Sequence, residues 1–283
     1  MRTYLVPIDF SQASINAAEF AAKLSEQTLV EHIVLLNAYY VSPLETMLPN
    51  PDMVQLMEEE VEHEVADRIK KLEHLKHKLK AQVREGVEIS VHLNRSHLLR
   101  AVVENVSVKN ADLVILGSKG NTSKTDTKIG GHVISISKAS PVPVIVVPPQ
   151  YHFETITRVV VACDFDKVKE TVPLDSLKRL LDKKKFELLV VNIDKESKHL
   201  SGDAGRKAEE TALYQMLKPY QPTYSYVNNP NIISGILHFA TDNDAQLVIA
   251  LPHKYSFFQS LLHDSVSQQL AESAAVPVLL LKE

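Results

Sequence analysis

Four glycines follow the apolar run ADLVIL in the stretch LGSKGNTSKTDTKIGGHVIS, and three of them stand at characteristic offsets. Two residues separate Gly117 from Gly120, and nine separate Gly120 from Gly130. A strand that leads through such a turn into a helix presents free backbone N–H groups and the positive end of the helix dipole, which together bind phosphate. Glycine also occurs in ordinary turns between a strand and a helix. The glycines alone therefore leave a phosphate cradle and a plain loop open.

Several polar residues near this stretch allow both a ligand contact and a plainer role. Asp9 follows an apolar run, so its carboxylate fits an Asx turn, a helix cap or a ligand contact, and these roles are compatible. Lys124 and Lys128 fit phosphate contacts or solvated loop positions. His132 stands where the next helix begins, which fits a phosphate contact or a helix surface.

Metal and catalytic patterns are weak. His63, His74 and His77 lie on the polar sides of one predicted helix without an evident further ligand, so we expect no zinc site. Cys163 ends a predicted buried strand, which favours a small buried hydrophobe over a reactive thiol. The sequence contains no P-loop, GxSxG, HExxH or EF-hand pattern, and no HIGH-like or SGGxDS-like signature. Enzymatic turnover is therefore not supported.

Bulk composition indicates a globular protein of two domains. The chain has 283 residues, 45% of them hydrophobic and 23% charged, and no segment approaches the ~20 consecutive apolar residues of a membrane span. A net charge of -4 without a dense basic block argues against nucleic acid and anionic membranes as partners. A single cysteine, together with an N-terminus unlike a signal peptide, leads us to expect a cytoplasmic protein.

The second half of the sequence repeats the first. YLVPIDFS matches VVVACDFD, HIVLLNAYY matches LLVVNIDK, ADLVILGSKG matches AQLVIALPHK, and SKASPVPVIVV matches AESAAVPVLLL. The first two pairs are 155 positions apart and the last two are 134 apart, so a single length change of 21 residues separates two constant offsets. We predict a duplicated domain, with one copy in residues 1–149 and the other in residues 155–283.

Each copy alternates apolar, β-branched runs with helical patterns. In the first copy these patterns predict strands near 3–8, 33–38, 87–93, 112–116 and 143–147, and helices near 14–27, 53–84, 97–108 and 131–139. Strands such as LVILG and VIVV are apolar on both faces, which is typical of a parallel sheet covered by helices on each side. The expected fold is α/β, with two doubly wound parallel-sheet sandwiches. Because each copy ends in a short apolar strand, we expect the two to pair as an intramolecular pseudo-dimer.

The extra residues of the first copy form a Pro-rich loop and a long amphipathic helix between about 42 and 86. The negative residues of this helix lie near its start and the positive residues near its end, as the helix dipole favours. The dipole therefore explains the charges of the helix without a bound ligand. Its apolar stripe comprises Val54, Met57, Val61, Val65, Ile69, Leu72, Leu75 and Leu79.

These motifs together resemble the universal stress protein family over nearly all of both halves. The resemblance rests on Val6-Pro7-Ile8-Asp9, on the spacing of Gly117, Gly120 and Gly130, and on the closing strand from Pro143 to Val147. It implies a flavodoxin-like sheet and an adenine nucleotide, ATP or AMP, bound by some members, with Mg²⁺ only alongside the nucleotide. The resemblance places Asp9 and Ala38 at the adenosine. Around the ribose and phosphates it places Gly117, Ser118, Gly120, Gly130, Gly131, His132 and Val133.

Two departures from the family pattern bear on binding. Gly131 stands where the family has Ser or Thr, so one hydroxyl that would bond a phosphate is missing. In the second copy Leu251, Lys254 and Asp264 replace the three motif glycines, and a carboxylate there would repel phosphate by roughly 1 to 4 kcal/mol. We therefore predict no phosphate site in the second copy and a structural role for Asp164.

Two functions remain open on this basis. The first is a stress-response regulator that binds one adenine nucleotide in the N-terminal domain. The second is a nucleotide-independent interaction module, in which the long helix and the loop from Pro43 to Pro51 contact a protein partner or a second copy of the chain. A slow ATPase is a weaker third reading.

Overall fold

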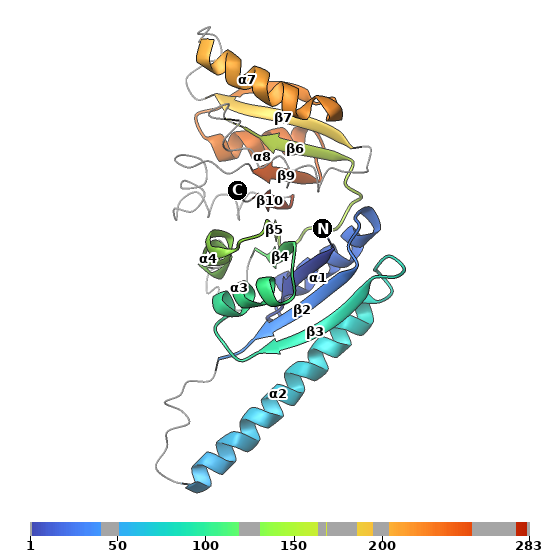
Figure 1. Ribbon diagram of the computed structural model, residues 1–283, viewed down its shortest axis with the longest axis vertical. Helices are drawn as coiled ribbons and strands as arrows, with labels where there is room; N and C mark the ends of the chain where they lie inside the picture. The colour runs from blue at the N-terminus through green and yellow to red at the C-terminus, as the bar shows by residue number, and fades with distance from the viewer. Residues whose placement is uncertain are drawn as a thin grey trace.

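The computed structural model describes residues 2–40, 51–118, 131–163, 168, 186–194, 204–250 and 276–281. Its strands form one ten-stranded sheet in the order β3-β2-β1-β4-β5-β10-β9-β6-β7-β8 (Figure 1). The first half contributes β1 (Thr3–Pro7), β2 (His32–Ala38), β3 (Glu88–Asn94), β4 (Leu113–Gly117) and β5 (Val144–Val147). The second half contributes β6 (Arg158–Ala162), β7 (Glu187–Asp194), β8 (Thr223–Asn228), β9 (Leu247–Ala250) and β10 (Val278–Leu280).

All neighbouring strands are parallel except β5 and β10, which pair antiparallel where the two halves meet. In that register Val146 faces Val278 and Val144 faces Leu280. The expected doubly wound α/β fold is confirmed, and the final strands of the two copies pair as predicted. The boundary between residues 149 and 155 remains a prediction.

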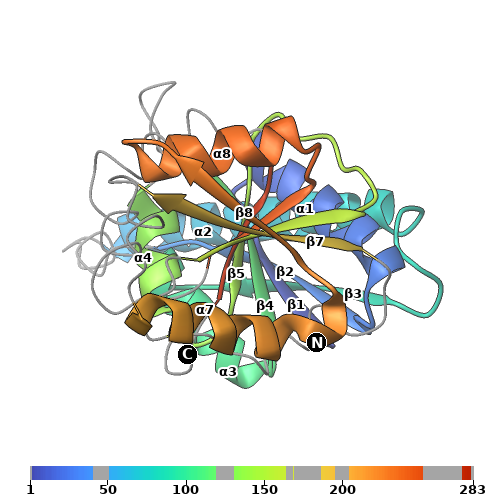
Figure 2. The ribbon, with the colours of Figure 1, turned by 90° about the horizontal axis from the view of Figure 1, so that it is seen from above.

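Helices cover both faces of the sheet. On one face α1 (Gln12–Leu24), α2 (Pro51–Leu79) and α7 (Ala204–Leu217) bury side chains in a single core that continues across the junction of the halves. On the other face α3 (Leu98–Val108) and α4 (Gly131–Ala139) cover the first half, and α8 (Ile232–Asp242) covers the second. Figure 2 shows the strands fanned by the twist that accumulates over so many neighbours. In the part of the chain that the structure describes, no helix is long and apolar enough to cross a membrane.

The predicted helices form, but two of them end earlier than their patterns suggest. After α1 the chain tightens into a 3-10 turn, η1 (Ser25–Gln27), where the Ser25 hydroxyl donates to the Ala22 carbonyl at 2.5 Å. Arg84 lies beyond the end of α2 because its backbone N–H bonds Ser25 Oγ at 2.8 Å and its guanidinium bonds the Val30 carbonyl at 2.6 Å. These long-range bonds replace the last turn of the predicted helix.

The apolar stripe of α2 changes surroundings along its length. Leu72, Leu75 and Leu79 are buried against the sheet, whereas Val61 and Val65 are only half-buried. Ile69 keeps 42% of its surface exposed. Figure 1 shows the first part of α2 running past the carboxyl ends of β2 and β3, away from the other described elements.

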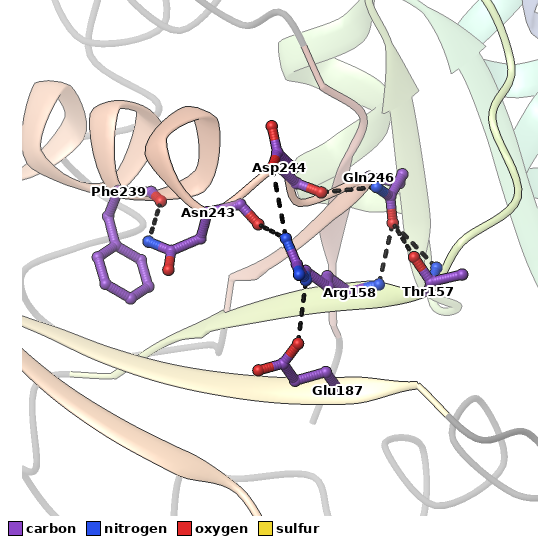
Figure 3. A network of polar contacts seen from close by, with 7 residues as sticks. All are labelled: Thr157, Arg158, Glu187, Phe239, Asn243, Asp244 and Gln246. Atoms are coloured by element: carbon purple, nitrogen blue, oxygen red, sulfur yellow. Dashed lines mark hydrogen bonds and ion pairs between the residues drawn. The ribbon is translucent and has the colours of Figure 1, made fainter.

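In both halves, a side-chain oxygen accepts backbone N–H groups at the amino end of a central strand. Asp112 Oδ2 accepts the N–H groups of Arg2 and Thr3 at 2.7 and 3.0 Å. At the corresponding position of the second half, Gln246 Oε1 accepts those of Thr157 and Arg158, both at 2.9 Å (Figure 3). The Arg158 guanidinium also bonds Glu187, the Asn243 carbonyl and Asp244. The duplication thus extends to side-chain chemistry.

The segment between the halves packs on α1. Phe20 makes edge-to-face contacts with Tyr151 and Phe153, at centroid distances of 6.0 and 5.4 Å. Gln27 bonds both backbone groups of Ile156, at 2.8 and 3.1 Å. The connection is therefore part of the core rather than a free linker.

Alkaline pH is expected to destabilise this fold through its buried tyrosines. Burial raises the pKa of Tyr4 to about 12, against an ordinary value of 10.0. The unfolded chain therefore loses this proton first, so stability is full below pH 10 and declines as pH rises towards 12. At about 1.4 kcal/mol per pKa unit, Tyr4 accounts for up to ~2.7 kcal/mol of that decline.

Urea unfolding followed by circular dichroism at pH 8, 10 and 11 measures the effect. Tyr4→Phe should flatten the decline, whereas Tyr40→Phe, in an exposed ring, should leave it unchanged. An equally steep decline in Tyr4→Phe would contradict the prediction.

Candidate functional site

The carboxyl ends of β1, β2 and β4 bring several of the predicted site residues to one edge of the sheet. From β1 the chain proceeds to β2 and β3 on one side and then crosses to β4 on the other side of β1. The strand order therefore reverses between β1 and β4. Asp9 follows β1, Ala38 ends β2, Gly117 ends β4, and Ser118 comes next. In doubly wound sheets the crevice at such a reversal is where ligands bind.

Asp9 forms the turn from β1 into α1. Its Oδ1 accepts the Ser11 N–H at 3.0 Å and the Ser11 hydroxyl at 2.5 Å, which is an Asx turn. Ser11 is in turn the N-cap of α1, since its Oγ accepts the Ser14 N–H at 3.2 Å. Phe10 between them has φ 62°, an uncommon value for a residue with a side chain. The structural reading of Asp9 is confirmed, and its contact with a ligand stays a prediction.

Asn37 fixes the last residue of the buried run before Asp9. Its Nδ2 donates to the Ile8 carbonyl at 2.6 Å, and the side chain is buried. Its Oδ1 accepts from Arg68 Nη1 of α2 at 3.1 Å. The second half keeps the first of these bonds, from Asn192 Nδ2 to the Cys163 carbonyl at 2.8 Å. The asparagine therefore serves the turn at the strand end in both copies.

Gly117 is required by packing. A Cβ on this residue would lie 2.5 Å from the Ala13 carbonyl oxygen and 2.6 Å from the Ala13 carbonyl carbon. These are backbone atoms in the first turn of α1 and cannot move away as a side chain can. The first glycine of the motif thus allows α1 to approach β4, independently of any phosphate.

Ser118 enters the site through its side chain rather than its backbone. Its N–H donates to the Val147 carbonyl at 2.9 Å and so continues the pairing of β4 with β5. The residue is 3% exposed, and among the described residues its hydroxyl has no hydrogen-bond partner. A buried hydroxyl without a partner is costly, which makes Ser118 Oγ a candidate for a ligand bond.

The helix after the glycines begins where the motif predicts. Gly131 is the first residue of α4, His132 is exposed, and Val133 is buried in the core beneath α3 and α4. Only the backbone of Val133 is therefore suited to a ligand contact. Gly120, Gly130, Lys124 and Lys128 lie outside the described residues.

The sequence patterns did not predict the aromatic and cationic side chains that lie beside this edge of the sheet. The Arg68 guanidinium lies over the Tyr39 ring at 5.7 Å, and Lys71 Nζ lies over the Phe10 ring at 5.8 Å. Tyr40 stacks on His97, the N-cap of α3, with ring centroids 3.8 Å apart. The helix dipole already explained the charged residues of α2. The sequence of this helix therefore did not indicate that Arg68 and Lys71 would lie over aromatic rings.

The other residues considered in the sequence analysis contribute little to the candidate site. His63, His74 and His77 are exposed along α2, and the described ranges hold no cluster of three or more metal-ligating side chains. Cys163 follows β6 as a half-buried residue packed against the core that lies beneath α1, α2 and α7. In the second copy, Asp164, Leu251, Lys254 and Asp264 all lie outside the described residues.

Comparison with known proteins gives the same family for both halves. The model of the universal stress protein family matches residues 1–148 and 155–282. No curated protein matches the chain. Among solved structures, a universal stress protein from Archaeoglobus fulgidus DSM 4304 is similar at 17% identity and TM-score 0.66, covering 99% of this chain and 98% of that one.

Two other solved structures illustrate the range of similarity. A protein of unknown function from Pseudomonas aeruginosa PAO1 has 14% identity and TM-score 0.59, covering 100% of this chain and 92% of its own. A universal stress protein in complex with cAMP has 18% identity and TM-score 0.35, covering 52% of this chain and 95% of its own.

Substitution of Gly117 is expected to test packing rather than binding. Gly117→Ala should lower the free energy of unfolding by about 1 to 3 kcal/mol without any ligand, because the new methyl group overpacks the backbone of α1. Ser118→Ala removes a buried hydroxyl without a described partner and therefore should not lower it. Urea unfolding of both apo variants gives the measurement. Equal stability of Gly117→Ala and the wild type would refute the packing role.

Proposed function

The chain belongs to the universal stress protein family, and from this premise we propose that it is a stress-response regulator that binds one adenine nucleotide, ATP or AMP. The proposed site lies in the N-terminal domain, residues 1–149, and the second domain, residues 155–283, has none. As part of the same proposal we place the protein in the cytoplasm, whose reducing conditions suit a chain with one cysteine.

The observation that carries the proposal is the strand reversal between β1 and β4. Asp9 and Gly117 stand at the carboxyl ends of these two strands, which pair directly. The segment after β4 leads to the N-terminus of α4. The positive dipole end of this helix suits an anionic ligand, whereas Asp9 and Ser11 already occupy the N-terminus of α1. Gly120 and Gly130, in the segment between β4 and α4, keep the spacing of the family motif, and ligands of doubly wound sheets bind at such a strand reversal.

The available donors fit a phosphate group. Ser118 offers a buried hydroxyl without a described partner, and Gly131 opens the first turn of α4, where backbone N–H groups have no partner within the helix. The absence of a hydroxyl at position 131 removes one bond, which weakens binding rather than preventing it.

Asp9 suits the sugar or base rather than the phosphates. Its carboxylate is negative and half-buried, and its Oδ1 already accepts two hydrogen bonds from Ser11. A carboxylate accepts from hydroxyl or amino groups and repels phosphate. We propose no catalytic residue, and Mg²⁺ enters this proposal only as a companion of the nucleotide phosphates.

The proposal predicts that one hydroxyl strengthens binding. Gly131→Ser should raise ATP affinity by about 5- to 150-fold, because it adds a bond to a charged phosphate worth about 1 to 3 kcal/mol. Gly131→Ala adds a similar volume without a hydroxyl and is the matched control. Ser118→Ala should bind ATP more weakly than the wild type does.

Calorimetric titration with ATP, AMP and cAMP, with and without Mg²⁺, measures these affinities after any co-purified nucleotide has been removed. A stoichiometry of one per chain is expected. The absence of binding up to millimolar ligand in both the wild type and Gly131→Ser would reject the nucleotide proposal.

A second function is favoured by the projecting part of α2. Its stripe residues Val61, Val65 and Ile69 keep part of their surface exposed although the same stripe is fully buried further along. Glu59, Glu60 and Glu62 lie beside them and are exposed. An apolar strip flanked by acidic residues suits a protein partner that carries apolar and basic side chains. This alternative needs no nucleotide.

Photo-crosslinking in cells tests this alternative. A photoreactive residue at position 65 should give one discrete cross-linked species, and Ile69→Glu should abolish it because a carboxylate opposes burial of the strip. The same photoreactive residue at Lys78, on the exposed side of the packed end of α2, is the control. Cross-linking at both positions to the same extent, or none at 65, would argue against an interface on this strip.

A further inference from the structure

The stacked pair Tyr40–His97 is an aromatic feature that the core does not explain. The ring centroids are 3.8 Å apart and the planes are inclined by 22°. Tyr40 follows β2, whereas His97 precedes α3, so two separate segments must converge to form the stack. Both residues are exposed, and Tyr40 keeps 51% of its surface in water. Neither belongs to one of the hydrophobic core clusters.

The backbone holds this pair beside the proposed nucleotide site. Ala38 pairs with Asn94 in the last register position of β2 and β3, and the Tyr39 N–H donates to the Asn94 carbonyl at 3.0 Å. This bond carries the pairing one residue further towards Tyr40. Tyr40 thus stands two residues beyond Ala38, which the nucleotide proposal places at the adenosine.

In the part of the chain that the structure describes, neither side chain of the pair makes a hydrogen bond or an ion pair. His97 is the N-cap of α3, but its side chain makes no capping bond. The neighbouring Tyr39 is covered differently, by the Arg68 guanidinium at 5.7 Å. Stacked rings prefer offset faces, and a half-exposed ring in such a stack retains surface for another planar group.

From these observations we propose that Tyr40, supported by His97, is the stacking platform for the base of the bound ligand. This inference rests on the proposed nucleotide-binding function and specifies how that site selects its ligand. Every base has a π-face, so the platform accepts any planar heterocycle, and the larger face of a purine gains more contact than that of a pyrimidine. The platform therefore discriminates by ring size, while hydrogen bonds from the backbone near Ala38 supply finer selection.

Stacking of a base on an aromatic side chain is worth about 1 to 3 kcal/mol, which corresponds to about 5- to 150-fold in affinity. Tyr40→Leu should lower ATP affinity by a factor in this range, whereas Tyr40→Phe, which keeps the ring, should stay within about threefold of the wild type. The preference for ATP over CTP should shrink in Tyr40→Leu. His97→Ala should lower ATP affinity less, because it removes the support and leaves the platform itself.

The full-length protein, stripped of co-purified nucleotide, is titrated with ATP and with CTP by calorimetry. Tyr214→Leu is the matched control, since that ring is 47% exposed in α7 of the second half, outside the proposed site. Thermal melting of each apo variant verifies that its fold is intact; Tyr40 is exposed, so little change is expected.

The outcomes separate this inference from the function on which it rests. If the wild type binds neither ATP nor CTP, the nucleotide proposal fails and the platform with it. If the wild type binds ATP but Tyr40→Leu binds it equally well, only the platform is overturned. Equal losses for ATP and CTP, with an unchanged ratio, would also overturn selection by ring size.

Discussion

The antiparallel contact between β5 and β10 is the constraint on which this architecture depends. Without it, each half would end in a short apolar strand with unpaired backbone groups at a sheet edge. The register sets Ile145 opposite Leu279, and both side chains enter the same core. This core therefore runs beneath α1 and α7 without interruption, although these helices belong to different halves. The two copies therefore share one continuous sheet and one core, even though their sequences repeat as two.

The repeated and the unrepeated features divide between structure and function. Asp112 and Gln246 hold the amino ends of the central strands in the two halves, and Asn37 and Asn192 hold the turn at their carboxyl ends. These bonds satisfy backbone groups that any copy of the fold must satisfy. The glycine spacing and the length of α2 differ between the copies. These two features are therefore not needed to pair the backbone groups that both copies have in common. Differences between duplicated halves therefore mark where a function beyond folding is to be sought.

Sequence patterns predicted the strands, the helices and the pairing of the final strands, because periodicity and apolar runs report burial directly. They missed contacts that depend on how close two distant segments come. The need for glycine at 117 follows from the backbone of Ala13, and the stack of Tyr40 on His97 depends on the pairing of β2 with β3. The structural role of Asn37 could have been predicted from the sequence, since a polar residue recurs at the same place in the matching apolar runs of the two halves. Its partner Arg68 could not, because it lies 31 positions away on a helix whose charges already had an explanation.

Arg68 also links the two surfaces for which functions are proposed. It projects from α2 near the exposed part of the stripe, and it bonds Asn37, which holds the Ile8 carbonyl next to Asp9. A ligand at Asp9 and a partner on α2 would therefore act on the two ends of one short hydrogen-bonded chain. If a partner shifts Arg68, the bond to Asn37 weakens, and by thermodynamic reciprocity a ligand that stabilises this turn would change partner affinity by the same factor. The bond from Arg68 to Asn37 lies in the first half, where the motif glycines also stand.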